Sequence, residues 1–127
     1  MLTIKTHIAN AGEKGLGLFS DEFVSAGKLV WKEDLRFDVR ILNKNLSHDH
    51  LNFLQHYGCL VGDEWQVCLD NARFINHSNN PNIKTIDDTM CYSTRDIQIG
   101  EEITIDYLDI CDYEKDNGLH FLNKEIK

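Results

Sequence analysis

Short alternations of apolar and polar residues recur along the chain and predict strands rather than long helices. Residues 2–8 alternate in this way, as a strand with one buried face does. Further strands, each with β-branched or aromatic residues, are predicted at 29–31, 37–41, 65–69, 90–97 and 102–107. Glycine-containing loops or turns separate them at 11–17, 25–27 and around Gly100.

One helix is predicted over residues 47–58, as an insert between strands. Ser47 is a suitable N-cap, and Gly58 is a suitable C-cap. The apolar face comprises Leu51, Phe53, Leu54 and Tyr57. Core packing is the preferred role for Phe53, while Tyr57 is equally suited to the core or to a site. The whole pattern indicates a mostly β fold with small α content.

Composition and charge narrow the class of protein. A chain of 127 residues with 42% apolar and 27% charged residues is expected to form one globular domain, 1–127. Its 13 basic and 21 acidic residues give 13 − 21 = −8, which disfavours nucleic acid as a direct partner. An acidic chain suits a basic partner, although acidic surfaces also serve solubility alone.

The sequence also lacks the patterns typical of membrane-spanning, secreted and metal-binding proteins. No apolar run has the roughly 18 residues of a membrane span, and the first residues lack a signal-peptide pattern. We therefore expect an intracellular, cytoplasmic chain with no membrane partner. The four cysteines (Cys59, Cys68, Cys91 and Cys111) are too widely spaced for a zinc pair, and we expect reduced thiols. His48 and His50 would face different sides of a helix, so no metal is expected.

Three segments carry candidate chemistry. The first is EKGLGLF at 13–19, the second RFINHSNNPN at 73–82 and the third GEEITIDY at 100–107. Taken singly, they suit a tight glycine turn, a loop with internal hydrogen bonds and a strand that ends in a packed tyrosine. The first lacks both the third glycine of a dinucleotide fingerprint and the Gly-Lys-Ser/Thr end of a P-loop.

Together, the order and spacing of these segments resemble the SET domain, the family of S-adenosylmethionine-dependent protein lysine methyltransferases. The resemblance runs from Gly15 to Tyr107 and so covers most of the chain. It implies a SET-domain (β-clip) fold of small curved sheets, in which a C-terminal pseudoknot brings Asn76 beside Tyr107. Such threading is an exception among folds.

The resemblance also implies roles for individual residues. The implied cofactor site consists of Gly15, Leu16, Gly17, Arg73, Asn76 and His77. Asn76 would bind the methionine end of S-adenosylmethionine, and the His77 backbone would contact the adenine edge. Arg73 matches a position that usually supports this loop. Tyr107 matches the catalytic tyrosine, and it would line the lysine channel with Ile105 and Tyr57.

Departures from the family pattern limit what can be carried over. Only Cys111 follows Tyr107, so we expect no zinc-binding segment after the domain, and 108–127 would have to close the channel or simply pack. Ile105 stands where relatives often have Phe or Tyr, and a smaller side chain would leave room for more methyl groups. Acidic residues after Tyr107 suit either a basic peptide or plain solvation.

The resemblance thus implies an enzyme that methylates lysine in a basic, histone-like protein or peptide. A histone substrate would imply a nuclear or host-nuclear location. Two other readings stay open: a catalytically idle SET module that binds peptide or cofactor, and, more distantly, a small metal-dependent hydrolase. The sequence indicates no oligomeric state.

Overall fold

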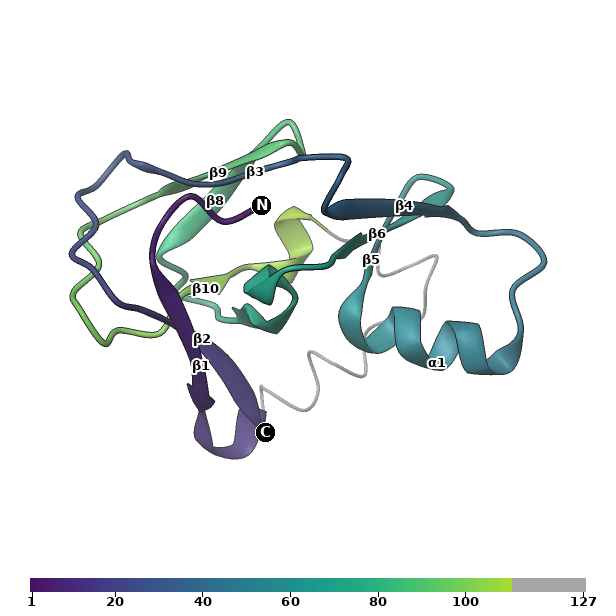
Figure 1. Cartoon of the computed structure of the whole chain (residues 1–127), viewed down its shortest axis with the longest axis horizontal. Helices are drawn as coiled ribbons and strands as arrows, with labels where there is room; N and C mark the ends of the chain where they lie inside the picture. Colours follow the sequence, from purple (N-terminus) through teal and green to yellow (C-terminus); the bar gives the residue numbers. More distant parts are fainter. Residues whose placement is uncertain (111–127) are drawn as a thin grey trace.

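The structure, a computed structural model, describes residues 1–110. The chain folds into several small sheets rather than one large one (Figure 1). Its strands are β1 (Thr6–Asn10), β2 (Leu16–Ser20), β3 (Leu29–Lys32), β4 (Asp38–Leu42), β5 (Cys59–Val61), β6 (Glu64–Cys68), β7 (Asn76–His77), β8 (Ile83–Ile86), β9 (Met90–Ser93) and β10 (Thr104–Ile105). The helix α1 (His48–Tyr57) lies between β4 and β5, and 3-10 turns occupy Gly12–Lys14 (η1), Asn71–Phe74 (η2) and Tyr107–Asp109 (η3). The predicted mostly β fold is confirmed.

Three antiparallel units account for most of the strand pairing. β1 and β2 form a hairpin, β8 and β9 join β3 in the order β3-β9-β8, and β4, β6 and β5 form a third sheet with β6 in the middle. In Figure 1 the hairpin and the β3-β9-β8 sheet lie on one side of the molecule, and β4, β5, β6 and α1 lie on the other.

The fourth unit joins two segments that lie far apart in the sequence. β7 pairs in parallel with β10, with Asn76 opposite Thr104 and His77 opposite Ile105. Asn82, only 1% exposed, fastens the same two segments: its Nδ2 donates to the Glu102 carbonyl at 2.8 Å and its Oδ1 accepts from the Thr104 N–H at 2.9 Å. The pairing brings the middle and C-terminal motifs together, as the predicted pseudoknot requires; the threading itself stays a prediction.

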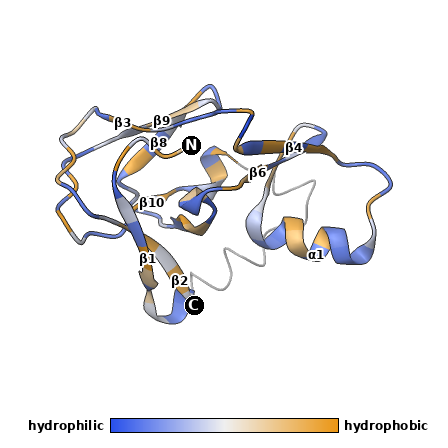
Figure 2. Ribbon diagram, viewed as in Figure 1, coloured by the Kyte–Doolittle hydropathy of each residue, from blue (hydrophilic) through white to orange (hydrophobic). Residues whose placement is uncertain are grey.

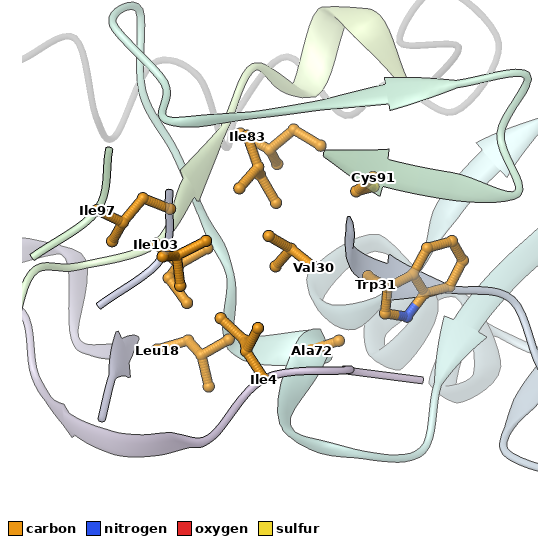
Figure 3. Packing of buried hydrophobic residues seen from close by; sticks show 11 residues of the cluster. Ile4, Leu18, Val30, Trp31, Ala72, Ile83, Cys91, Ile97 and Ile103 are labelled. Atoms are coloured by element: carbon orange, nitrogen blue, oxygen red, sulfur yellow. The ribbon is translucent and has the colours of Figure 1, made fainter. Parts of the chain in front are cut away.

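Two separate clusters of buried side chains stabilise these units. The larger cluster packs the hairpin against the β3-β9-β8 sheet and contains Ile4, Leu18, Val24, Val30, Trp31, Ala72, Ile83, Cys91, Ile97, Ile103 and Ile105 (Figure 3). The smaller contains Leu54, Leu60, Trp65 and Val67 and packs α1 on the β4-β6-β5 sheet. In the ribbon of Figure 2, hydrophilic and hydrophobic residues alternate along α1.

The helix begins and ends as its sequence predicts. The Ser47 hydroxyl accepts from the His50 N–H at 3.1 Å, and the His50 ring accepts from the Ser47 N–H at 3.0 Å, which forms a capping box. The Gly58 N–H closes the other end on the Leu54 carbonyl. Phe53, however, is 46% exposed, so its predicted core position is wrong; Leu54 is the buried residue of the helix.

Several strand boundaries differ from the predicted ones. Regular pairing starts at Thr6 rather than Leu2, which makes only an isolated bridge to Trp31. The strands predicted at 90–97 and 102–107 are confined to β9 and β10, and β2, β5 and β8 were not predicted as strands. The loop predicted at 73–82 contains η2 and the two-residue strand β7.

The structure also bears on the expectations about membrane-spanning helices and about the cysteines. Among residues 1–110, no helix combines the length and apolar character that a bilayer crossing needs. Cys68 and Cys91 are free thiols, as expected for reduced cysteines, whereas Cys59 is disulfide-bonded and so departs from that expectation. Cys111 and the proposed closing residues Tyr113, Leu119, Phe121 and Leu122 lie outside the described residues.

Candidate active site

Two cavities meet at one group of side chains. The first, here called the hairpin cavity, measures about 300 Å³ and is bounded by the loop between β1 and β2 and by Phe74 and Asn76. The second, the inter-sheet cavity, measures about 130 Å³ and lies between residues of β4 and β6 and residues of β3 and β9. His56, Tyr57, Arg73 and Tyr107 line both. A molecule in one cavity would therefore face a molecule in the other across these four side chains.

The hairpin cavity contains most of the predicted cofactor residues. Gly15, Leu16, Arg73 and Asn76 line it, whereas Gly17 and His77 do not. The Asn76 amide donates to the Leu16 carbonyl and to Glu102 Oε2, both at 2.9 Å. Three segments that are distant in the sequence thus converge on one amide group.

Glu102 is the residue that the sequence argument did not single out. Its other oxygen pairs with the Lys14 ammonium at 2.7 Å, and its side chain is only 18% exposed. The pair places a cation and an anion beside Asn76. The residue belongs to the C-terminal motif, but only the pairing of β7 with β10 reveals that it faces Asn76.

Close packing explains Gly17 better than contact with a ligand does. A Cβ at this position would lie 2.7 Å from Glu102 Oε2, 2.9 Å from the Ala11 Cβ and 3.1 Å from Asn76 Nδ2. Gly15 differs, because its φ of +83° requires a left-handed backbone while a Cβ there would meet open space. Gly15 therefore shapes the loop between β1 and β2, and Gly17 lets the side chains of Glu102 and Asn76 pack against the backbone.

Tyr107 is held at both its backbone and its hydroxyl. The hydroxyl donates to the Ile75 carbonyl at 2.7 Å, and the Tyr107 N–H donates to His77 Nδ1 at 3.0 Å. Since Nδ1 accepts, the proton of a neutral His77 ring lies on Nε2, which is 3.0 Å from Asn79 Oδ1. The imidazole, 3% exposed, positions Tyr107, a role that the sequence argument did not assign to it.

A cluster of rings lies where the two cavities adjoin. The Arg73 guanidinium lies 5.7 Å from the centre of the Tyr57 ring and 5.0 Å from that of Phe74, within cation–π range. Tyr57 and Phe74 meet edge to face at 6.1 Å. Arg73 thus fixes the end of α1 against η2. Tyr57, for which the sequence left core and site equally open, lines both cavities.

The inter-sheet cavity has an apolar wall beside Tyr107. Ile105, 4% exposed, and Ile75 line it beside the tyrosine. Farther along, β6 contributes Cys68, whose thiol pKa is raised chiefly by burial and further by the carboxylates of Asp38 and Asp70. Candidate ligand atoms of these last three residues lie within 4.8 Å of one another. Both Asp70 oxygens, however, accept backbone N–H groups, from Leu2 at 2.8 Å and from Ala72 at 3.1 Å.

Comparisons with known proteins find similarity to SET-domain proteins in both sequence and fold. A protein-family model described as the SET domain matches residues 15–108. The crystal structure of a candidate histone methyltransferase from Plasmodium falciparum has a TM-score of 0.61 at 24% identity and covers 84% of this chain and 95% of that one. The methyltransferase domain of the human histone-lysine N-methyltransferase SETMAR has a TM-score of 0.56 at 22% identity, with 84% of this chain and 45% of that one covered. A search among curated proteins finds no match.

Proposed function

Since the chain belongs to the SET-domain family, we propose that it is an S-adenosylmethionine-dependent methyltransferase of lysine side chains in a basic, histone-like protein or peptide. The observation that carries this proposal is the meeting of two cavities at Tyr107. Methyl transfer between a cofactor and an amine needs two binding spaces that share one reacting position, so that neither molecule blocks the other.

The polar groups of the hairpin cavity fit the amino-acid end of S-adenosylmethionine. Lys14 offers an ammonium to its carboxylate, while the Leu16 carbonyl and Glu102 offer acceptors to its α-ammonium. Asn76, bonded to both acceptors, would hold them in place. When bound, S-adenosylmethionine supplies a methyl group attached to a positively charged sulfur.

Tyr107 would act as an acceptor rather than as a base. Its hydroxyl proton is donated to Ile75, so toward a lysine amine or a positively polarised methyl group the oxygen presents electron density. Fixing the amine in line with the methyl group is the main requirement, and such positioning contributes roughly 7–11 kcal/mol in favourable cases. The His77 contact to the Tyr107 backbone supports this orientation.

The lysine must also lose its proton before it can attack. A lysine with an ordinary pKa of about 10.4 needs roughly 4–5 kcal/mol for deprotonation at pH 7. The apolar wall formed by Ile105 and Ile75 disfavours the charged ammonium and so reduces this cost. No metal is needed for this reaction. The predicted closing role of 108–127 stays a proposal.

The test is methyl transfer, with Tyr107→Phe as the diagnostic variant. Wild-type protein incubated with labelled S-adenosylmethionine and histone or another basic protein should add mass steps of one CH₂ to lysine, as read by mass spectrometry. Tyr107→Phe should lower kcat by about 100-fold or more while the cofactor Kd stays within about threefold, because the hydroxyl acts on the reacting atoms. Equal losses in kcat and affinity would contradict the assignment.

A matched control is available in Tyr92→Phe. Tyr92 lies on β9, contacts Met90 through its hydroxyl and lines neither cavity. This variant should keep wild-type kcat. Cofactor binding without transfer to any basic protein would favour the alternative function, an idle module.

A further inference from the structure

Three buried polar atoms around the inter-sheet cavity have no hydrogen-bond partner. They are Trp31 Nε1, Asp38 Oδ1 and Gln66 Nε2, and all three residues line that cavity. Within the described part of the chain, no other buried side-chain nitrogen or oxygen lacks a partner. A buried group without a partner costs about 1–3 kcal/mol, so three around one cavity indicate a ligand that pairs with them.

Of these three residues, Asp38 would interact most strongly with a ligand, because its carboxylate is charged and buried. It is 4% exposed, and its Oδ2 already accepts from the Asp34 N–H at 2.7 Å and from the Met1 ammonium at 3.0 Å. Oδ1 has no nitrogen or oxygen donor, and the hydrogen-bonding group beside it is the protonated Cys68 thiol, a weak donor. Trp31, 8% exposed and visible beside Ala72 and Cys91 in Figure 3, adds an indole N–H.

The charges around the cavity favour a cation. Glu33, Asp38 and Asp88 line it, and Glu33 is neutralised by Arg40 through contacts of 2.9–3.1 Å. Asp38 is likewise paired through Oδ2 with the Met1 ammonium, so two cations stand against three carboxylates at this end of the cavity and the balance of charge there stays negative. The basic residue that lines this cavity, Arg73, sits at the opposite end among the rings of Tyr57 and Phe74.

A metal ion suits these groups less well than an organic cation. Asp70, the third member of the carboxylate–thiol cluster, has both oxygens engaged by backbone N–H groups. The Cys68 thiol next to it keeps its proton, because burial and two carboxylates disfavour the thiolate that a metal requires. A lysine or arginine side chain brings its own donors and needs neither group.

We propose that the inter-sheet cavity binds a second basic side chain of the substrate, an arginine or lysine flanking the methylated lysine, through Asp38 and Asp88. The indole N–H of Trp31 and the amide of Gln66 donate to carbonyl groups of the same peptide segment. This specificity rests on the proposed function, since the cavity continues to Tyr107. It gives the protein a preference for lysine within a basic sequence rather than for lysine alone.

The experiment measures binding without turnover. Alanine-based nonapeptides carry norleucine in place of the central lysine and arginine at each other position in turn, each with a citrulline counterpart of the same shape and no charge. Calorimetry with wild-type protein should show, at one position, about tenfold tighter binding of arginine than of citrulline. Equal affinities at every position would overturn the proposal.

Two variants assign the preference to the cavity. Asp88→Asn should lower it to about threefold and is expected to fold, because asparagine tolerates the φ of +62° found there. Asp38→Asn should abolish it. Asp63→Asn, which removes the same charge from an exposed turn between β5 and β6, should leave it unchanged. A preference that stays at about tenfold in Asp88→Asn, or one that disappears on adding a chelator, would overturn the proposal.

The outcome is separable from that of the proposed function. An arginine preference that depends on Asp88, in a protein that transfers no methyl group, would support the subsite and contradict the enzyme. Methyl transfer with no arginine preference would support the enzyme and contradict the subsite.

Discussion

At the scale of single residues, Glu102 connects the loop between β1 and β2 to the C-terminal motif. It bonds Lys14 with one oxygen and Asn76 with the other, and its carboxylate fills the space that Gly17 leaves open. The carboxylate thus positions two of the residues proposed to act at the cofactor, Lys14 and Asn76. Its effect should appear in cofactor affinity rather than in the chemical step.

Glu102→Gln tests this role. The amide keeps the shape and can still accept from Asn76, but it loses the charge that faces Lys14 and the cofactor ammonium. We expect the Kd for S-adenosylmethionine, measured by calorimetry, to rise about tenfold, which corresponds to about 1.4 kcal/mol. Glu22→Gln is the matched control, because Glu22 is also ion-paired, with Lys28 at 3.2 Å, but lines neither cavity. Unchanged affinity in Glu102→Gln would place the cofactor ammonium elsewhere.

At the scale of elements, the contact between the middle and C-terminal motifs depends on Asn82 as well as on β7 and β10. Two two-residue strands supply little pairing by themselves. The buried Asn82 side chain adds donors to the Glu102 carbonyl and, at 3.1 Å, to Glu101. Its carbonyl accepts from Thr104. The side chain therefore acts as a third rung between the two segments.

Asn82→Asp should therefore destabilise the fold strongly. The carboxylate can still accept from Thr104, but it loses both donors and places a charge beside Glu101 in a buried position. We expect the free energy of unfolding, measured in urea, to fall by about 3 kcal/mol. Asn80→Asp makes the same change at an exposed position two residues earlier and should alter it by less than about 0.5 kcal/mol. Equal effects of the two would show that Asn82 is not the fastening residue.

Elements with local signals could be predicted from the sequence, and elements that depend on distant partners could not. The helix α1 is defined by Ser47, Gly58 and the apolar spacing between them. β7 and β10 are strands only because they pair with each other, so no pattern within either two-residue segment could predict them. β5 and β8 are likewise short and become strands by pairing with β6 and β9.

The same distinction applies to the candidate site. The sequence motifs predicted Gly15, Asn76 and Tyr107 as site residues, and all three line the hairpin cavity. The positioning role of the His77 ring and the contact of Glu102 with Asn76 arise from packing across distant segments. Phe53 illustrates the opposite error, since an apolar position in a short helix need not face the core.

At the scale of the whole molecule, the two hydrophobic clusters divide the described chain at the inter-sheet cavity. The β4-β6-β5 sheet and α1 have their own small core, and the hairpin with the β3-β9-β8 sheet has the larger one (Figure 1). The cavity is lined from both sides, by Val67 of the small cluster and by Ile83 of the large one. Relative motion of the two parts would change its width and hence access to Tyr107.

Hydrogen exchange can detect such a division. Because four buried side chains stabilise less than the larger cluster does, amides of α1 and β6 should open at a lower free energy than those of β8 and β9. Leu54→Ala, which leaves a cavity in the small cluster, should speed exchange in α1 and β6 and leave β8 and β9 unchanged, provided that exchange there does not require global unfolding. Ile83→Ala should instead speed exchange in β8 and β9, because it weakens the larger core. If Leu54→Ala speeds exchange in both parts equally, the molecule opens as one unit, and access to Tyr107 cannot be controlled by movement of α1 alone.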